Sequence, residues 1–268
     1  MMNRIDKKFE ELKGKKKTAF IPFITAGDPD IETTKALILA FEKRGADIIE
    51  LGIPFSDPIA DGPVIQASYH RALEKGIKVT QILDTISTLR KKTQIPIVGM
   101  ISYSIVYKFG NKTFVEMALK AGLDGLTIPD LPIEENEEIF DIASKNNLKI
   151  VCFIAPTTTN QRMNLITRKT QGFLYYISVV GITGARDTLP EDIVQNISKL
   201  KQLTDIPIVV GFGVSTAEQA RMVGKIAEGV IVGSAIIKEI ERYEREHQEK
   251  LVENVGNFVE KLVIGAKS

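Results

Sequence analysis

The stretch AFIPFITAGDPDIETTKALILAFEKRGADIIELG, residues 19–52, decides the fold. Its apolar run 19–25 predicts a strand, and the pattern of 31–44 predicts an amphipathic helix. Gly45 follows that helix, where glycine is favoured because it tolerates a left-handed backbone. A second apolar run, 47–51, predicts another strand. A strand, a helix and a strand in this order indicate a parallel β-α-β unit.

The same alternation continues along the chain. The other apolar runs, typical of parallel strands buried on both faces, are 97–101, 125–128, 149–155, 173–178, 208–211 and 229–232. Helical patterns between them include 134–147, 190–203 and 216–227. We predict an α/β fold: a (β/α)8 TIM barrel as a single domain over 1–268, with an extra N-terminal helix at 3–13. The alternative, a doubly wound open sheet, would carry a dinucleotide fingerprint after its first strand, and AGDPD does not match one.

Composition excludes several classes of function. With 35 Lys and Arg against 34 Asp and Glu, the net charge of +1 does not indicate binding to nucleic acid or to an anionic membrane. The absence of a long apolar run or an apolar leader leads us to expect a cytoplasmic protein. Cys152 lies in an apolar run and is expected to be a buried hydrophobe. His70 and His247 are far apart, so we expect no metal site, and catalysis should depend on carboxylates, Tyr or Lys.

The active site of such a barrel lies at the carboxyl ends of the strands. Glu50 stands near the end of the strand 47–51 and shares one face with Ile48. A carboxylate in so apolar a strand either points into a cavity or forms a salt bridge at the barrel rim. In a cavity, loss of hydration would raise its pKa and let it donate and accept a proton near neutral pH.

The loop 53–63, IPFSDPIADGP, is too apolar for a simple solvated turn and reads as a binding loop. Asp61 within it is either a catalytic acid or the N-cap of a helix that begins at Gly62 or Pro63. The loop 179–188 either closes over a substrate or is an ordinary surface loop.

Glycine-rich turns follow the last two predicted strands, at 211–215 and 233–235. Backbone N–H groups at such turns and at the following helix can bind phosphate without Lys or Arg. The alternative is a pair of ordinary tight turns.

The chain resembles the tryptophan synthase alpha subunit family. The matching stretches run in family order and are FIPFITAGDPD (20–30), DIIELGIPFSDPIADGPVIQ (47–66), PDLPIEE (129–135), GITGAR (181–186), VGFGVS (210–215) and VGSA (232–235). The resemblance implies a lyase that cleaves indole-3-glycerol phosphate to indole and glyceraldehyde 3-phosphate by a retro-aldol reaction in tryptophan biosynthesis.

The resemblance also implies residue roles. Glu50 would protonate indole C3 and take the proton of the side-chain hydroxyl, and Asp61 would stabilise positive charge at the indole N–H. The indole pocket would be lined by Phe23, Leu126, Tyr175 and Phe212. The phosphate would be held by Gly184, Gly213, Gly233 and Ser234, with Thr183 beside the substrate. Thr183 and Asp57 would pair on loop closure.

The family works as an α2β2 complex with a beta subunit. Pyridoxal phosphate is then expected in that partner, and no cofactor in this chain. One segment departs from the family: Ser104 and Ile105 replace the usual Asn and Pro in a stretch that faces the beta subunit.

The residues by themselves are also compatible with two other functions. One is a different phosphate-binding barrel enzyme, such as a sugar-phosphate isomerase or a Schiff-base aldolase, although Lys149 lies at the entry end of its strand. The other is a non-enzymatic activator that works through its partner.

Overall fold

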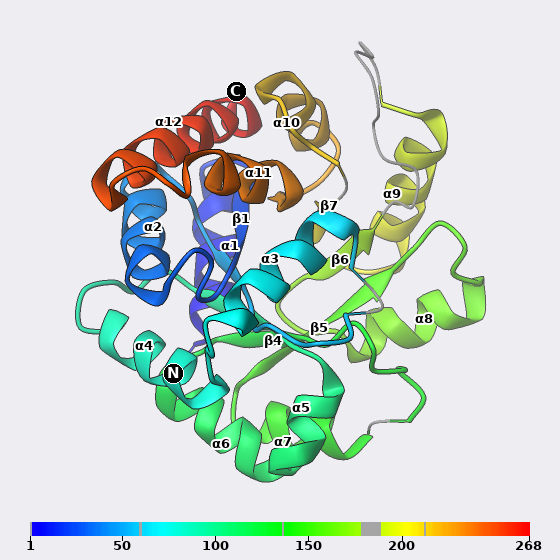
Figure 1. Ribbon diagram of the computed structural model, residues 1–268. Coiled ribbons are helices and arrows are strands. Elements are labelled where there is room, and N and C mark those ends of the chain that lie inside the picture. The colour runs from blue at the N-terminus through cyan, green and yellow to red at the C-terminus, as the bar shows by residue number, and fades with distance from the viewer. Residues whose placement is uncertain (1, 59–60, 136, 178–188, 212) are drawn as a thin grey trace.

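The computed structural model describes residues 2–58, 61–135, 137–177, 189–211 and 213–268. Within them, strands pair in sequence order into a closed parallel barrel, as predicted (Figure 1). The strands are β1 (Ala19–Thr25), β2 (Ile49–Gly52), β3 (Ile97–Met100), β4 (Gly125–Thr127), β5 (Lys149–Ile154), β6 (Leu174–Ile177), β7 (Ile208–Gly211) and β8 (Gly229–Val232).

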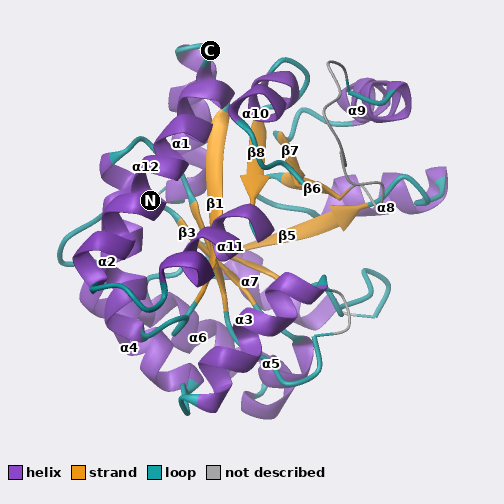
Figure 2. Ribbon diagram, turned by 45° about the horizontal axis from the view of Figure 1, so that its top comes forward, coloured by secondary structure: helices purple, strands orange, loops and turns teal. Residues whose placement is uncertain are grey.

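Helices form the outer layer of the barrel (Figures 1 and 2). The described helices are α1 (Arg4–Gly14), α2 (Ile31–Lys43), α3 (Pro63–Glu74), α4 (Val79–Leu89), α5 (Tyr103–Phe109), α6 (Asn111–Ala121), α7 (Glu137–Lys145), α8 (Asn160–Lys169), α9 (Glu191–Leu203), α10 (Ala217–Gly224), α11 (Ser234–Tyr243) and α12 (Gln248–Lys267). None of these helices is long and apolar enough to cross a membrane.

Some predicted bounds shift in the structure. The strand predicted from residue 47 begins at Ile49. Asp47 is instead a buried anchor, because its carboxylate accepts from the Phe20 N–H at 2.9 Å and pairs with Lys267 at 2.8 Å. Gly45 has the predicted positive φ, +92°. Pro190 occupies the N-cap position of α9, one residue earlier than its favoured place in the first helical turn.

The strand register decides which side chains face the inside of the barrel. Phe23 pairs with Glu50 across β1 and β2, and Glu50 pairs with Val98 of β3. Paired residues of neighbouring parallel strands point to the same face, and residues two apart along a strand also share a face. The face of Glu50 therefore also carries Gly52 and, through Val98 and Gly125, Thr127.

Helix α1 closes the end of the barrel where the strands begin. Ile5 packs against the start of β4, and the Phe9 ring lies 5.8 Å from the ring of Phe173. The buried Asp124 pairs with Arg4 at 2.9 Å and with Arg90 at 2.8 Å. The opposite end of the barrel, where the strands finish, is the end at which an active site is expected.

Candidate active site

Glu50 is buried on the inner face of β2, 2% exposed. The Thr127 hydroxyl donates to it at 3.2 Å. Among the residues that the structure describes, no Lys, Arg or His forms an ion pair with it, so the rim salt bridge considered from the sequence is wrong. Burial raises the pKa of Glu50 to about 8, and the charge of Asp61 adds to that rise, against the hydrogen-bonding contacts with Thr127 and Tyr175. This carboxyl group holds a proton near neutral pH.

Asp61 lies two residues before α3 and is not its cap. The N-cap residue is Gly62, which has no side-chain cap hydrogen bond. The Asp61 backbone is held in place instead, since its N–H donates to the Pro58 carbonyl at 3.1 Å and its carbonyl accepts from Gln66 at 2.8 Å. Burial raises the pKa of the carboxyl to about 6, and the charge of Asp130 adds to the rise. The N-cap alternative is therefore wrong, and the carboxylate is available to a ligand.

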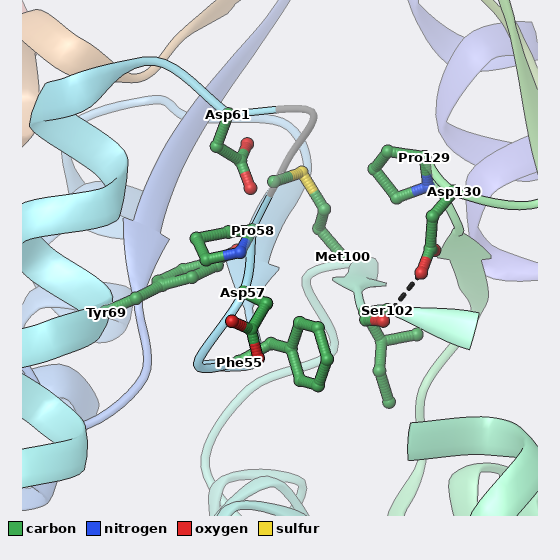
Figure 3. A pocket seen from close by; sticks show the side chains of 10 residues that line it. Phe55, Asp57, Pro58, Asp61, Tyr69, Met100, Ser102, Pro129 and Asp130 are labelled. Carbon is green, nitrogen blue, oxygen red and sulfur yellow. Dashed lines mark hydrogen bonds between the residues drawn. The ribbon is translucent and has the colours of Figure 1, made fainter. Parts of the chain in front are cut away.

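A hollow at the barrel mouth lies in front of Asp61. Figure 3 shows Asp61 and Tyr69 on the side of α3 and Asp130 on the opposite side, with the Met100 side chain between them. The Ser102 hydroxyl donates to Asp130 at 2.6 Å and fixes that second wall. The predicted loop residue Asp57 also lines the hollow.

Aromatic rings fill the inner face next to Glu50. Gly52 has no side chain, and an idealised Cβ there would lie 2.6 Å from the tip of the Phe23 ring. A Cβ on Gly211 of β7 would lie 2.4 Å from the Tyr175 ring. These glycines are therefore what lets the two predicted aromatic residues, Phe23 and Tyr175, lie across the barrel mouth. Phe153 of β5 joins them, with its ring 4.9 Å from that of Tyr175.

Leu126 does not lie with this group. Thr127 faces Glu50, and its neighbour Leu126 points to the opposite face, where it packs near Gly99. The residue of β4 beside Glu50 is therefore Thr127. Successive strand residues alternate faces, so a difference of one residue is enough to move a side chain from the inner to the outer layer.

The two predicted phosphate-binding turns differ in whether side chains cap the backbone N–H groups of the helix that follows. At α10, Thr216 and Gln219 form a capping box, and Gln219 also accepts from the Ser215 N–H at 2.8 Å. At α11, Gly233 is the N-cap without a side-chain bond, so the first N–H groups from Ser234 onward have no capping side chain. The N-terminus of α11 is therefore the better anion site. Gly213, in the turn between β7 and α10, has a φ of +46° and is exposed.

Other predicted residues fall outside the described residues or away from the site. Thr183, Gly184 and Phe212 lie outside the described residues, as does the whole of the loop 179–188. Cys152 is buried, which raises the pKa of its thiol to about 12 and agrees with an unreactive side chain. Among the described residues no group of His, Cys, Asp and Glu could hold a metal ion.

The barrel mouth thus combines a protonated carboxyl group, a carboxylate, an aromatic wall and an open helix N-terminus. Comparison with known proteins adds a family to this geometry. The model of the family described as tryptophan synthase alpha chain matches residues 9–264. This chain belongs to that family.

Curated tryptophan synthase alpha chains are similar over nearly the full length. The chain from Thermoanaerobacter sp. strain X514 is 46% identical over 261 residues, which is 97% of this chain and 98% of the relative. The chain from Caldanaerobacter subterraneus subsp. tengcongensis is 48% identical over 239 residues, 89% of this chain and 91% of the relative.

Solved structures agree. The tryptophan synthase subunit alpha of Legionella pneumophila superposes with a TM-score of 0.92 at 36% identity and covers 99% of both chains. A structure of the tryptophan synthase a2b2 complex from Pyrococcus furiosus matches with a TM-score of 0.83 at 39% identity, over 91% of this chain and 97% of that one.

Sequence reasoning missed three residues of this tryptophan synthase alpha chain site. Thr127 and Phe153 lie on the inner face, two residues on from Gly125 and Val151, and it is the strand register that shows which residues of β4 and β5 face inward. Tyr69 reaches the mouth from α3, and the helical pattern alone marks it only as part of the buried face of that helix.

Proposed function

We propose that this tryptophan synthase alpha chain cleaves indole-3-glycerol phosphate to indole and glyceraldehyde 3-phosphate, with Glu50 and Asp61 as its catalytic pair. The observation that carries the proposal is the buried Glu50, whose pKa of about 8 keeps a proton available beside the partly buried Asp61. Cleavage of the carbon–carbon bond requires protonation of the ring carbon, which a carboxylic acid of raised pKa supports.

The proposed steps conserve protons and electrons. Glu50 gives its proton to indole C3, and the Asp61 carboxylate stabilises the positive charge that spreads to the ring N–H. The Glu50 carboxylate then takes the proton of the hydroxyl next to the ring. As that oxygen becomes a carbonyl, the carbon–carbon bond breaks and its electron pair returns to the indole ring. Glu50 ends protonated, ready for another turnover.

The rest of the mouth suits the substrate. Phe23, Tyr175 and Phe153 offer an aromatic, largely apolar wall to an indole ring. The open N-terminus of α11 offers backbone N–H groups to a phosphate. We propose that Gly233 and Ser234 bind the phosphate together with Gly213 and Gly184, and that Thr183 contacts the substrate and pairs with Asp57.

A beta subunit is the proposed partner, in an α2β2 complex, and pyridoxal phosphate would be bound there. Helix α5 supports a partner surface, because Tyr107 is 74% exposed and lies beside Tyr103, with the two tilted rings 6.2 Å apart between centroids. The Ser102–Ile105 departure lies at the start of this helix and bears on partner contact. We propose the cytoplasm as the location, since the one cysteine is free.

A Schiff-base aldolase finds no support. Lys149, at the start of β5, pairs with Asp6 of α1 at 2.7 Å and so lies at the closed end of the barrel. Borohydride in the presence of a sugar phosphate should therefore trap no adduct.

The test is release of indole from indole-3-glycerol phosphate, with the beta subunit titrated in. The wild-type chain should release indole, and Glu50→Gln should lose at least about 100-fold in rate while keeping its circular dichroism spectrum. Glu74→Gln, on the exposed end of α3, is the matched control and should retain the wild-type rate. Absence of indole with and without the partner would contradict the proposal, and an activating effect of an inactive chain on the partner would favour the non-enzymatic alternative.

A further inference from the structure

Tyr69 of α3 brings a hydroxyl group to the end of β2. Its side chain is buried, 3% exposed. An idealised Cβ on Gly52 would lie 2.8 Å from the Tyr69 hydroxyl oxygen, so this oxygen occupies the place where a side chain at position 52 would stand. Glycine at the end of β2 is what gives the phenol its room.

That place belongs to the inner face of the barrel. Gly52 is two residues after Glu50 on the same strand and shares its face. Tyr69 also lines the hollow in front of Asp61 (Figure 3). The phenol therefore lies next to both acids, and the charges of Asp61 and Glu50 are both felt at Tyr69.

The hydroxyl of Tyr69 lacks a protein acceptor. Within the part of the chain that the structure describes, it makes no hydrogen bond, whereas the buried hydroxyls of Thr127 and Thr25 are bonded to Glu50 and Ser68. Among the described residues the fully buried side-chain atom without a partner is Asn111 Oδ1, so the Tyr69 hydroxyl oxygen is reached from the pocket, where a ligand atom can accept its hydrogen bond. Burial, followed by the nearby negative charges, raises the pKa of the phenol well above its usual value, so the group remains a donor at all working pH values.

We propose that the Tyr69 hydroxyl donates a hydrogen bond to the substrate hydroxyl oxygen next to the indole ring, the oxygen that becomes the aldehyde carbonyl. This inference rests on the proposed function. Of the substrate groups between the two acids, the ring N–H is itself a donor and C3 receives the proton of Glu50. The hydroxyl oxygen is the group that can accept.

The bond would strengthen as the reaction proceeds. When Glu50 takes the hydroxyl proton, negative charge develops on that oxygen before the carbonyl is complete. A fixed neutral donor stabilises such charge more in the transition state than in the bound substrate. Tyr69 keeps its own proton throughout, so the proton balance between substrate and Glu50 is unchanged.

The experiment compares the wild-type chain with Tyr69→Phe, each with the beta subunit. We expect kcat for indole release to fall about 100-fold, the low end for loss of one such donor. Indole-3-propanol phosphate lacks the acceptor hydroxyl, so its dissociation constant should stay within about twofold of wild type. Tyr176→Phe is the matched control: it removes a buried hydroxyl that bonds Asn196 at 3.1 Å on the outer side of β6, and its kcat should be that of wild type.

Other results would overturn the inference. An unchanged kcat would do so, and so would a parallel loss of kcat and of analogue binding, which indicates a packing role. If wild type itself releases no indole, the proposed function fails and this inference fails with it. If Tyr69→Phe does not fold, 3-fluorotyrosine at position 69 keeps the ring and makes a stronger donor. It should raise kcat without changing analogue binding, and an unchanged or lower kcat would overturn the inference.

Discussion

Glu50 is a carboxyl group buried inside the barrel, which is energetically unfavourable. Glu50 is surrounded by hydroxyl groups and aromatic rings rather than by a cation. Its neighbour Asp61 is less buried and has the lower pKa, about 6 against about 8. Two acids whose environments separate their pKa values can act as proton donor and charge-stabilising carboxylate at the same pH.

This separation predicts a bell-shaped dependence of kcat/KM on pH. Below about pH 6 Asp61 becomes protonated and loses its charge, and above about pH 8 Glu50 loses the proton that it must donate. Indole release should therefore be fastest between these values. Because Glu50 and Asp61 interact, the two apparent pKa values of this profile describe the pair of acids rather than either residue alone. A rate that is level from about pH 5 to about pH 9 would contradict the assignment.

Glu50 should also make stability depend on pH. Its pKa rises from 4.5 to about 8 on folding, so the folded chain keeps a proton that the unfolded chain has lost between these values. The stability of wild type therefore falls as pH rises through this window, and Glu50→Gln should be the more stable protein at pH 9, by on the order of 5 kcal/mol. Urea unfolding of both proteins at pH 4.5 and pH 9 measures this difference, and a difference that does not grow with pH would contradict it.

Gly52 is expected to tolerate no side chain. An added Cβ would meet the Phe23 ring and the Tyr69 hydroxyl at 2.6 and 2.8 Å. Gly52→Ala should lower the free energy of unfolding by about 1–3 kcal/mol through overpacking and should reduce indole release. Gly14→Ala is the control, because nothing lies within 4 Å of a Cβ there, and it should be neutral or slightly stabilising. Equal thermal stability of the two variants would contradict this account.

At the scale of elements, helix α3 connects the loop that contains Asp61 to the barrel mouth. It begins two residues after Asp61 and carries Tyr69 on its buried face. Arg71, one turn from its end, pairs with the buried Asp28 at 2.7 Å and with Glu241 of α11 at 3.2 Å. The helix is thereby tied to the loop after β1 and to the helix that begins the proposed phosphate site.

Loss of this tie should affect both stability and rate. Arg71→Met leaves the Asp28 carboxylate buried without its partner, which should cost about 3 kcal/mol in urea unfolding. The rate of indole release should also fall, because α3 positions Asp61 and Tyr69. Arg221→Met removes a fully exposed pair with Glu218 and should leave stability nearly unchanged. The same small effect in both variants would show that the Asp28 pair does not hold α3.

For the whole molecule, the two ends of the barrel have separate tasks. One end is sealed by α1 and by Asp124, which is 3% exposed and also accepts from the Ile97 N–H at 2.9 Å. The other end carries the acids, the rings and the open N-terminus of α11. A change at the sealed end should therefore affect stability without changing the chemistry.

Asp124→Asn tests this separation. The substitution removes the charge of Asp124, so Arg4 and Arg90 lose their shared partner. The free energy of unfolding should therefore fall by about 3 kcal/mol. The pH profile of indole release from the folded protein should stay that of wild type. Asp84→Asn, on the exposed face of α4, is the control and should match wild type in both measurements. A shifted pH profile in Asp124→Asn would show that the two ends are coupled.

The order of strands and helices and the position of Glu50 could be predicted from the sequence, because hydrophobic period and strand alternation are local properties. The starts of β2 and α9 differ from the prediction by one or two positions: Asp47 is held by hydrogen bonds to distant residues instead of joining the strand, and Pro190 is the N-cap of its helix. Leu126 shows the limit of local reasoning. A pattern of small and apolar residues does not say which member of a short strand faces inward.

Only the closed barrel decided what surrounds each acid. Asp61 could be read equally as a cap or as a catalyst until the chain geometry made Gly62 the N-cap. Thr127, Phe153 and Tyr69 come from three different elements, and the barrel brings them to one mouth. The pKa of Glu50 depends on this burial rather than on its neighbours in sequence, because loss of hydration is produced by groups that meet only when the strands pair.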